Sequence, residues 1–129
     1  MTRWWPVLAY AALILLVSSI PASSMPVSQT LWSLDKVMHC LEYAVLAALL
    51  SRALAASAPG LGPAALWAAA MLGAALFGAV DEWYQSFTPG RLSSRYDALA
   101  DAAGAVAGAA LNGLWLVRRK GSQSHGHRS

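Results

Sequence analysis

Every acidic residue of the chain lies in one of three short clusters, and each cluster occupies one end of a long apolar segment. The clusters pair Asp35 with Glu42, Asp81 with Glu82, and Asp97 with Asp101. Basic and hydrogen-bonding residues accompany them, namely Lys36, His39, Tyr43, Tyr84, Gln85, Arg91, Arg95 and Tyr96. Carboxylates beside an imidazole and guanidinium groups can bind a polar headgroup, transfer protons or hold a metal ion. We therefore expect the chemistry of this chain to reside in these clusters.

Helical spacing gives the first cluster a common face. Asp35, His39 and Glu42 recur at intervals of four and three residues, and Tyr43 lies beside them. Glu42 would lie about 10 Å along a helix from Asp35, at a depth where an ionisable side chain in a membrane is costly unless it is paired. This depth favours a functional role for Glu42. The alternative is a Glu42 that only fixes helix packing.

The other two clusters also share faces. Asp81 and Gln85 are four residues apart, with Glu82 turned by about 100° from Asp81. Asp97 and Asp101 lie on a face that continues into Gly104 and Gly108, a GxxxG pattern that permits close helix contact. The acids therefore point into a helix bundle, where we expect the three clusters to meet in one site.

The composition places the chain among membrane proteins. Hydrophobic residues make up 57% of the 129 residues and charged residues only 12%, too few to cover a soluble surface. We predict one domain over residues 1–120, an all-α bundle of four transmembrane helices at about 4–20, 36–56, 64–85 and 97–117, followed by a polar cytoplasmic tail at 121–129. Two alternatives stay open: a soluble Ala-rich bundle, and a first segment that is a cleaved signal peptide.

The distribution of basic residues predicts the orientation. With four crossings the two termini share one side, which collects Arg3, Arg52, Arg118, Arg119, Lys120 and Arg128. The other side holds Lys36, Arg91 and Arg95. The positive-inside rule then places both termini in the cytoplasm and the acidic clusters outside. The basic residues are a topology signal, so no nucleic-acid partner is expected.

Two local signals refine this prediction. The pair Pro89-Gly90 is typical of a type II turn, in which glycine supplies the positive φ, and this turn would swing Arg91 back toward the helix ends. Cys40 is the single cysteine, which excludes an intrachain disulfide and a cysteine metal cluster.

The motifs of the three clusters resemble the VanZ-like family of small bacterial integral membrane proteins. The resemblance rests on Asp35-Lys36-x-x-His39-x-x-Glu42-Tyr43, on Asp81-Glu82-x-x-Gln85-x-Phe87-x-Pro89-Gly90-Arg91, on Asp97 followed by Gly104 and Gly108, and on Ser18-Ser19-Ile20-Pro21. It departs at Asp101, where the family more often has asparagine. The resemblance implies a multi-pass protein of the bacterial inner membrane. The family takes its name from a factor associated with lowered susceptibility to glycopeptide antibiotics of the teicoplanin type, and it has no agreed biochemical activity.

Several functions compete for the polar site. The first is binding of a lipid-linked or cell-envelope headgroup, in which Arg91 and Arg95 would form bidentate hydrogen bonds to a phosphate or carboxylate. The second is an enzyme on the same substrate, with His39 or Glu42 as general base. A scaffold or partner-docking bundle is the third, and an ion transporter is disfavoured because the cytoplasmic halves of the helices carry no acid.

The sequence predicts no cofactor. A divalent ion, Mg²⁺ or Mn²⁺ on the carboxylates or Zn²⁺ with His39, would balance the excess of acids over bases. No segment has a diagnostic ligand spacing for such an ion. The ligand and the oligomeric state do not follow from the sequence.

Overall fold

The computed structural model describes residues 2–24, 32–91 and 95–125, and their side chains except at 22, 32–35, 95 and 114–125. Within these ranges the chain is all helical, as predicted, and contains no strand. The elements are α1 (Trp5–Ser18), the short 3-10 helix η1 (Ala22–Ser24), α2 (Trp32–Ser57), α3 (Pro63–Gln85) and α4 (Arg95–His125). The expected loops around Ser28 and Ser93 lie outside the described residues.

The helices α2 and α4 extend past their expected limits. α2 begins at Trp32, so that Asp35 lies inside its first turn, and α4 continues through residues 121–125, which the sequence assigned to a polar tail. Hydropathy marks where an apolar stretch ends, whereas a helix ends where its backbone hydrogen bonding ends. No proline follows residue 95, and Gly121 costs only about 1 kcal/mol in a helix, so nothing in the local sequence stops α4 at 117.

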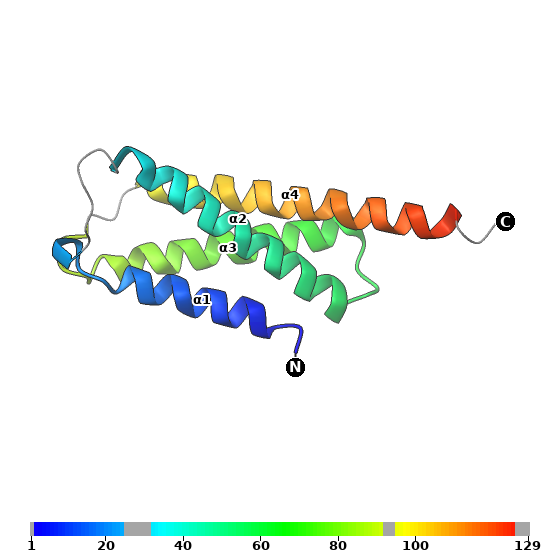
Figure 1. Cartoon of the computed structure of the whole chain (residues 1–129), viewed down its shortest axis with the longest axis horizontal. Helices are drawn as coiled ribbons and strands as arrows, with labels where there is room; N and C mark the ends of the chain where they lie inside the picture. Colours follow the sequence, from blue (N-terminus) through cyan, green and yellow to red (C-terminus); the bar gives the residue numbers. More distant parts are fainter. Residues whose placement is uncertain (1, 25–31, 92–94, 126–129) are drawn as a thin grey trace.

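The four helices run alternately up and down, which brings four helix ends together at each end of the bundle (Figure 1). The C-terminal ends of α1 and α3 meet the N-terminal ends of α2 and α4 at the left of the view. The N-terminal end of α1 and the C-terminal end of α4 lie toward the opposite end. The acidic clusters therefore share one end of the bundle, as the alternation of helix direction predicted.

The closest helix contact joins α4 to α2. A Cβ atom added at Gly104 would lie 2.8 Å from the carbonyl carbon of Cys40, and one added at Gly108 would lie 2.6 Å from that of Ala44. Such distances leave no room for any side chain, so the two backbones pass each other in direct contact. The packing role predicted for the GxxxG pattern is confirmed.

Small residues and one tyrosine fill the interior. Ala47, Ala70, Ala74, Ala105 and Ala109 are fully buried, together with Tyr43 and Leu46. α1 packs against α2 and α3. At the end away from the acidic clusters it is joined to α2 by Trp4 Nε1, which donates to Ser57 Oγ at 3.0 Å, and by Arg3, which donates to the carbonyl of Ala56.

The outer surface is strongly apolar. Among the described residues, two helices, Lys36–Ser57 and Pro63–Gln85, are long and apolar enough to cross a membrane, and Trp5–Ser18 is a shorter apolar helix. Large hydrophobic side chains are exposed on every helix, including Leu16, Leu41, Leu76 and Leu111, each more than half exposed. The expected arrangement of four helices is confirmed, and a membrane-crossing role is supported for two of them by length and composition.

The α2–α4 contact generates a prediction with a matched control. We expect Gly108→Ala to lower the free energy of unfolding by about 1–3 kcal/mol, because the new methyl group meets the Ala44 backbone. Gly113→Ala, where no atom lies within 4 Å of the added Cβ, should be neutral or stabilise by up to about 1 kcal/mol through helix propensity. Thermal melting of both variants in detergent measures the difference, and equal melting temperatures would contradict the close contact.

Candidate functional site

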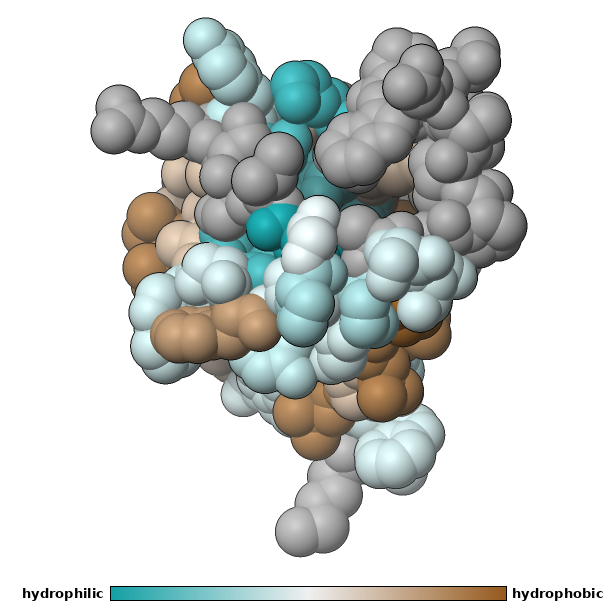
Figure 2. All heavy atoms as spheres, turned by 90° about the vertical axis from the view of Figure 1, so that its left-hand side faces the viewer, coloured by the Kyte–Doolittle hydropathy of each residue, from teal (hydrophilic) through white to brown (hydrophobic). Residues whose placement is uncertain are grey.

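The described members of the acidic clusters, apart from the partly buried Glu42, are buried inside one end of the bundle. The polar residues with less than a tenth of their surface exposed at this end are Ser18, His39, Asp81, Glu82, Gln85, Thr88, Asp97 and Asp101. Figure 2 views this end directly and shows hydrophilic side chains at its centre, with hydrophobic side chains around the periphery. Polar groups buried at this density must satisfy one another or a ligand.

Asp81 is the centre of the first set of hydrogen bonds. Its Oδ2 atom accepts from Ser18 Oγ at 2.9 Å, from Tyr43 Oη at 3.2 Å and from Gln85 Nε2 at 2.9 Å. Gln85 Nε2 also donates to Ser18 Oγ at 3.0 Å. One carboxylate oxygen of α3 therefore ties together α1 and α2. The sequence analysis did not select Ser18 as a site residue, although Ser18 belongs to the Ser18-Ser19-Ile20-Pro21 run that contributed to the family resemblance.

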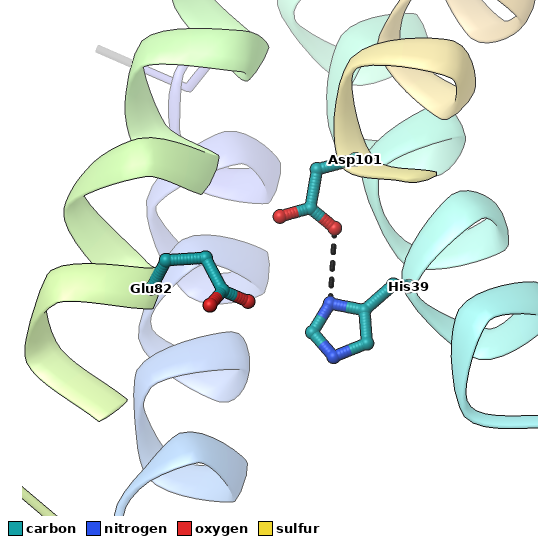
Figure 3. A group of neighbouring side chains, drawn as sticks. All are labelled: His39, Glu82 and Asp101. Carbon is teal, nitrogen blue, oxygen red and sulfur yellow. Dashed lines mark hydrogen bonds and ion pairs between the residues drawn. The ribbon is translucent and has the colours of Figure 1, made fainter. Parts of the chain in front are cut away.

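His39 and Asp101 form the second set. His39 Nδ1 lies 2.9 Å from Asp101 Oδ1, and both side chains are buried. Glu82 approaches this pair from α3, as Figure 3 shows. One potential ligand atom from each of the three residues lies within 4.8 Å of the others. The sequence placed these residues in three different clusters, and the fold joins them into one group.

Lys36 and Asp97 form an ion pair nearer the surface. Lys36 Nζ lies 3.2 Å from Asp97 Oδ1, and the Lys36 side chain is half exposed whereas that of Asp97 is buried. The same ammonium lies 5.9 Å from the ring centroid of Tyr96, within range of a cation–π contact. Lys36 therefore neutralises the outermost buried acid.

Arg91 is directed at the backbone of α1. The predicted type II turn is present, because Arg91 N donates to the Thr88 carbonyl at 3.1 Å and Gly90 has φ of 76°. This turn carries the guanidinium to the end of α1, where Nη2 donates to the Val17 carbonyl at 2.9 Å and Nε donates to that of Ile20 at 3.3 Å. Thr88 Oγ1 donates to the Ser18 carbonyl at 3.1 Å. These bonds bring side-chain donors to backbone carbonyls at the C-terminal end of α1, where the regular helical hydrogen bonding stops.

Glu42, Asp35 and Arg95, which the sequence also assigned to the site, are not among the contacts described above. Glu42 lies on α2 beside Tyr43, is partly buried, and forms no hydrogen bond or ion pair with the described part of the chain. The side chains of Asp35 and Arg95 lie outside the described residues. The expected site thus divides into a buried group of His39, Glu82 and Asp101, the neighbouring hydrogen bonds of Asp81, and an outer ion pair.

Buried carboxylate oxygens without a hydrogen-bond partner among the described residues include Asp81 Oδ1 and Asp101 Oδ2, and both residues are about 1% exposed. Three acids, Asp81, Glu82 and Asp101, are buried in this region, whereas His39 is the one basic side chain buried with them in the described ranges. The region therefore carries an excess of acidic groups, and burying such groups is costly without a compensating proton or cation.

Comparison with protein families identifies the family of the chain. The VanZ/LLP1 family profile matches residues 4–116, which covers nearly all of the helical bundle. The chain belongs to the VanZ/LLP1 family. Comparison with curated proteins and with solved structures gives no significant match. Membership of VanZ/LLP1, together with two helices that could cross a bilayer, indicates association with the membrane.

The hydrogen bonds of Asp81 generate the second prediction. We expect Ser18→Ala to lower the free energy of unfolding by about 1–2 kcal/mol, because Asp81 and Gln85 both lose a buried partner. Ser51 is equally buried, but its Oγ has no hydrogen-bond partner in the described ranges. Ser51→Ala should therefore be neutral or stabilising. Chemical or thermal unfolding of the two variants distinguishes them, and the prediction fails if Ser51→Ala costs as much as Ser18→Ala.

Proposed function

We propose that the protein is a multi-pass protein of the bacterial inner membrane, with four crossing helices and both termini in the cytoplasm. Exposed hydrophobic side chains on α1 and α4, such as Leu8, Leu13, Leu99 and Leu111, support the crossing of these two helices as well. The excess of basic residues at the termini supports the orientation. The polar end of the bundle then faces the outside of the membrane.

We further propose that this polar end binds the headgroup of a lipid-linked or cell-envelope molecule. The observation that carries the proposal is the buried group of His39, Glu82 and Asp101, contributed by three helices at one end of an otherwise apolar bundle. Ionisable residues inside a membrane are expensive, and their default interpretation is a functional site.

The surroundings of the group favour an amphiphilic ligand. The apolar outer surface of the helices would lie against acyl chains, while the polar end lies at the level of headgroups. Trp83, Phe87 and Tyr96 lie near this end of the bundle and are each about two thirds exposed. Trp83 and Phe87 pack edge to face with centroids 5.2 Å apart. Exposed aromatic side chains of this kind are enriched at membrane–water interfaces.

The arrangement changes which residues we expect to contact the ligand. Arg91 donates to α1 carbonyls and Lys36 pairs with Asp97, so both cations already have partners within the protein. Glu82 and Asp101 are the better candidates, and Glu42 is partly buried on α2 beside Tyr43. The family's link to glycopeptide susceptibility would follow if the bound headgroup belongs to a cell-wall precursor.

A second candidate function is an enzyme on the same headgroup. The Asp101 carboxylate holds His39 by its Nδ1 atom, the arrangement by which a carboxylate orients a general base. Glu82 lies beside this pair and could take the role of general acid. Release of a cleaved headgroup by the wild type, and not by His39→Gln, would favour this function over binding alone.

Native mass spectrometry tests the binding proposal. The protein is purified with its own lipids as wild type, as Glu82→Gln, and as Ser51→Ala, a control with a buried substitution in the C-terminal half of α2. We expect wild type and Ser51→Ala to retain an amphiphilic adduct that Glu82→Gln loses, with melting temperatures close to one another. Equal adducts in all three proteins would contradict the site, and loss of the adduct only in poorly folded variants would favour a scaffold.

Cysteine labelling tests the orientation. Single cysteines at Ser28, Ser93 or Ser122 are introduced into a Cys40→Ser background and treated in intact cells with an impermeant thiol reagent. We expect labelling at Ser28 and Ser93 but not at Ser122. The reverse pattern would overturn the proposed topology.

A further inference from the structure

We propose that His39, Glu82 and Asp101 bind one divalent transition-metal ion, Zn²⁺ or Mn²⁺, inside the bundle. The three residues come from α2, α3 and α4, and one ligand atom from each lies within 4.8 Å of the others. Ligand atoms about 2.1 Å from a tetrahedral ion are about 3.4 Å apart. Side-chain movements of the order of 1 Å would therefore bring the three ligand atoms to this separation. Figure 3 shows the carboxylates of Glu82 and Asp101 directed toward the space beside the His39 ring.

A carboxylate oxygen without a partner points independently to a cation. Asp101 is about 1% exposed, and its Oδ2 atom has no hydrogen-bond partner among the described residues. In Figure 3 this oxygen lies on the side of Asp101 that faces Glu82, away from the hydrogen bond to His39. A metal ion in this position would satisfy the oxygen, whose burial without a partner is otherwise costly.

Gly78 leaves space around Asp101 Oδ2. A Cβ atom at Gly78 would lie 3.1 Å from Asp101 Oδ2 and 3.1 Å from Tyr43 Cε1. These contacts are tighter than ordinary van der Waals separations, so a side chain at position 78 would press on the Asp101 carboxylate.

The charge balance agrees with a divalent ion. Asp81, Glu82 and Asp101 are buried on α3 and α4 at the same end of the bundle as His39, and Glu42 is partly buried on α2. The neighbouring cations already have partners, since Lys36 is paired with Asp97 and Arg91 donates to the backbone of α1. The two positive charges of a divalent ion would offset two of these four acidic charges.

The donor atoms select the class of ion. One imidazole nitrogen and two carboxylates form a mixed nitrogen and oxygen set, which suits Zn²⁺, Mn²⁺ or another first-row ion better than Mg²⁺ or Ca²⁺ with their preference for oxygen alone. Three protein ligands leave coordination positions open for a phosphate oxygen of a headgroup. That last role rests on the proposed function, whereas the metal site itself does not.

The test uses full-length protein in detergent with His125→Ala and His127→Ala, which leaves His39 as the sole histidine of the chain. The chelator-treated protein is titrated with Zn²⁺ and Mn²⁺, and bound metal is counted by elemental mass spectrometry after gel filtration. We expect one ion per chain, and an affinity weaker by at least tenfold in Asp101→Asn and in Glu82→Gln, since even loss of an outer-shell partner costs about 10–100-fold. Asp97→Asn, which removes a buried acid outside the group, should keep the parent affinity.

A spectroscopic readout does not depend on how the carboxylate variants fold. Electron spin echo of bound Mn²⁺ should show modulation from an imidazole nitrogen, and this modulation should disappear in His39→Gln. Three results would each overturn the site: no metal uptake, no nitrogen modulation, or a metal affinity in Asp101→Asn and Glu82→Gln equal to that of the parent protein.

A final arm separates this inference from the proposed function. Native mass spectrometry of the lipid adduct is repeated with and without chelator. If the ion binds but no adduct is found, the metal site stands and headgroup binding is rejected. An adduct of equal abundance with and without chelator would reject the role of the metal in holding the headgroup.

Discussion

The position of the polar groups depends on the direct backbone contact between α2 and α4. Gly104 meets the backbone at Cys40, and Gly108 meets it one helical turn further along at Ala44. This contact fixes the register of the two helices, and His39, the neighbour of Cys40, is thereby held against Asp101, one turn before Gly104. A slip of one turn would move Asp101 away from His39. The same two glycines thus determine both the tight packing of the bundle and the pairing of His39 with Asp101.

A second set of interactions attaches the C-terminal end of α1 to α3 and to the turn that follows α3. α1 is apolar along its length, yet its C-terminal end is held by polar groups: Ser18 donates to Asp81, and the segment Thr88–Arg91 donates to three backbone carbonyls. Asp81 and Arg91 therefore have structural partners of their own, in addition to any contact with a ligand. Substitutions at these two positions will disturb the attachment of α1, so Glu82 and Asp101 are the more direct probes of function.

Much of this arrangement could be predicted from the sequence because it follows from local patterns. Composition predicted an all-α membrane protein, helical spacing predicted that the acids face inward, and Pro89-Gly90 predicted a type II turn. The partners within the cluster could not be predicted in this way. Asp35, His39 and Glu42 share one face of a helix, but only the crossing of α2 and α4 decides that His39 meets Asp101. The target of Arg91 is likewise set by where α1 ends, which a turn signature does not indicate. The Ser18-Ser19-Ile20-Pro21 run contributed to the resemblance, but nothing in it indicates that Ser18 meets Asp81.

The length of α4 has a consequence for how the protein sits in its bilayer. A helix of 31 residues is about 46 Å long, whereas a hydrocarbon core is about 30 Å thick. With its N-terminal end at the outer face as proposed, α4 leaves roughly three turns of helix on the cytoplasmic side. Arg118, Arg119 and Lys120 then fall at the depth of the inner-leaflet phosphates, on a rigid rod instead of a loose tail. Attraction between three such cations and anionic lipids would resist vertical movement of α4, and through its glycine contact would hold α2, and the acidic end of the bundle, at a constant height in the membrane.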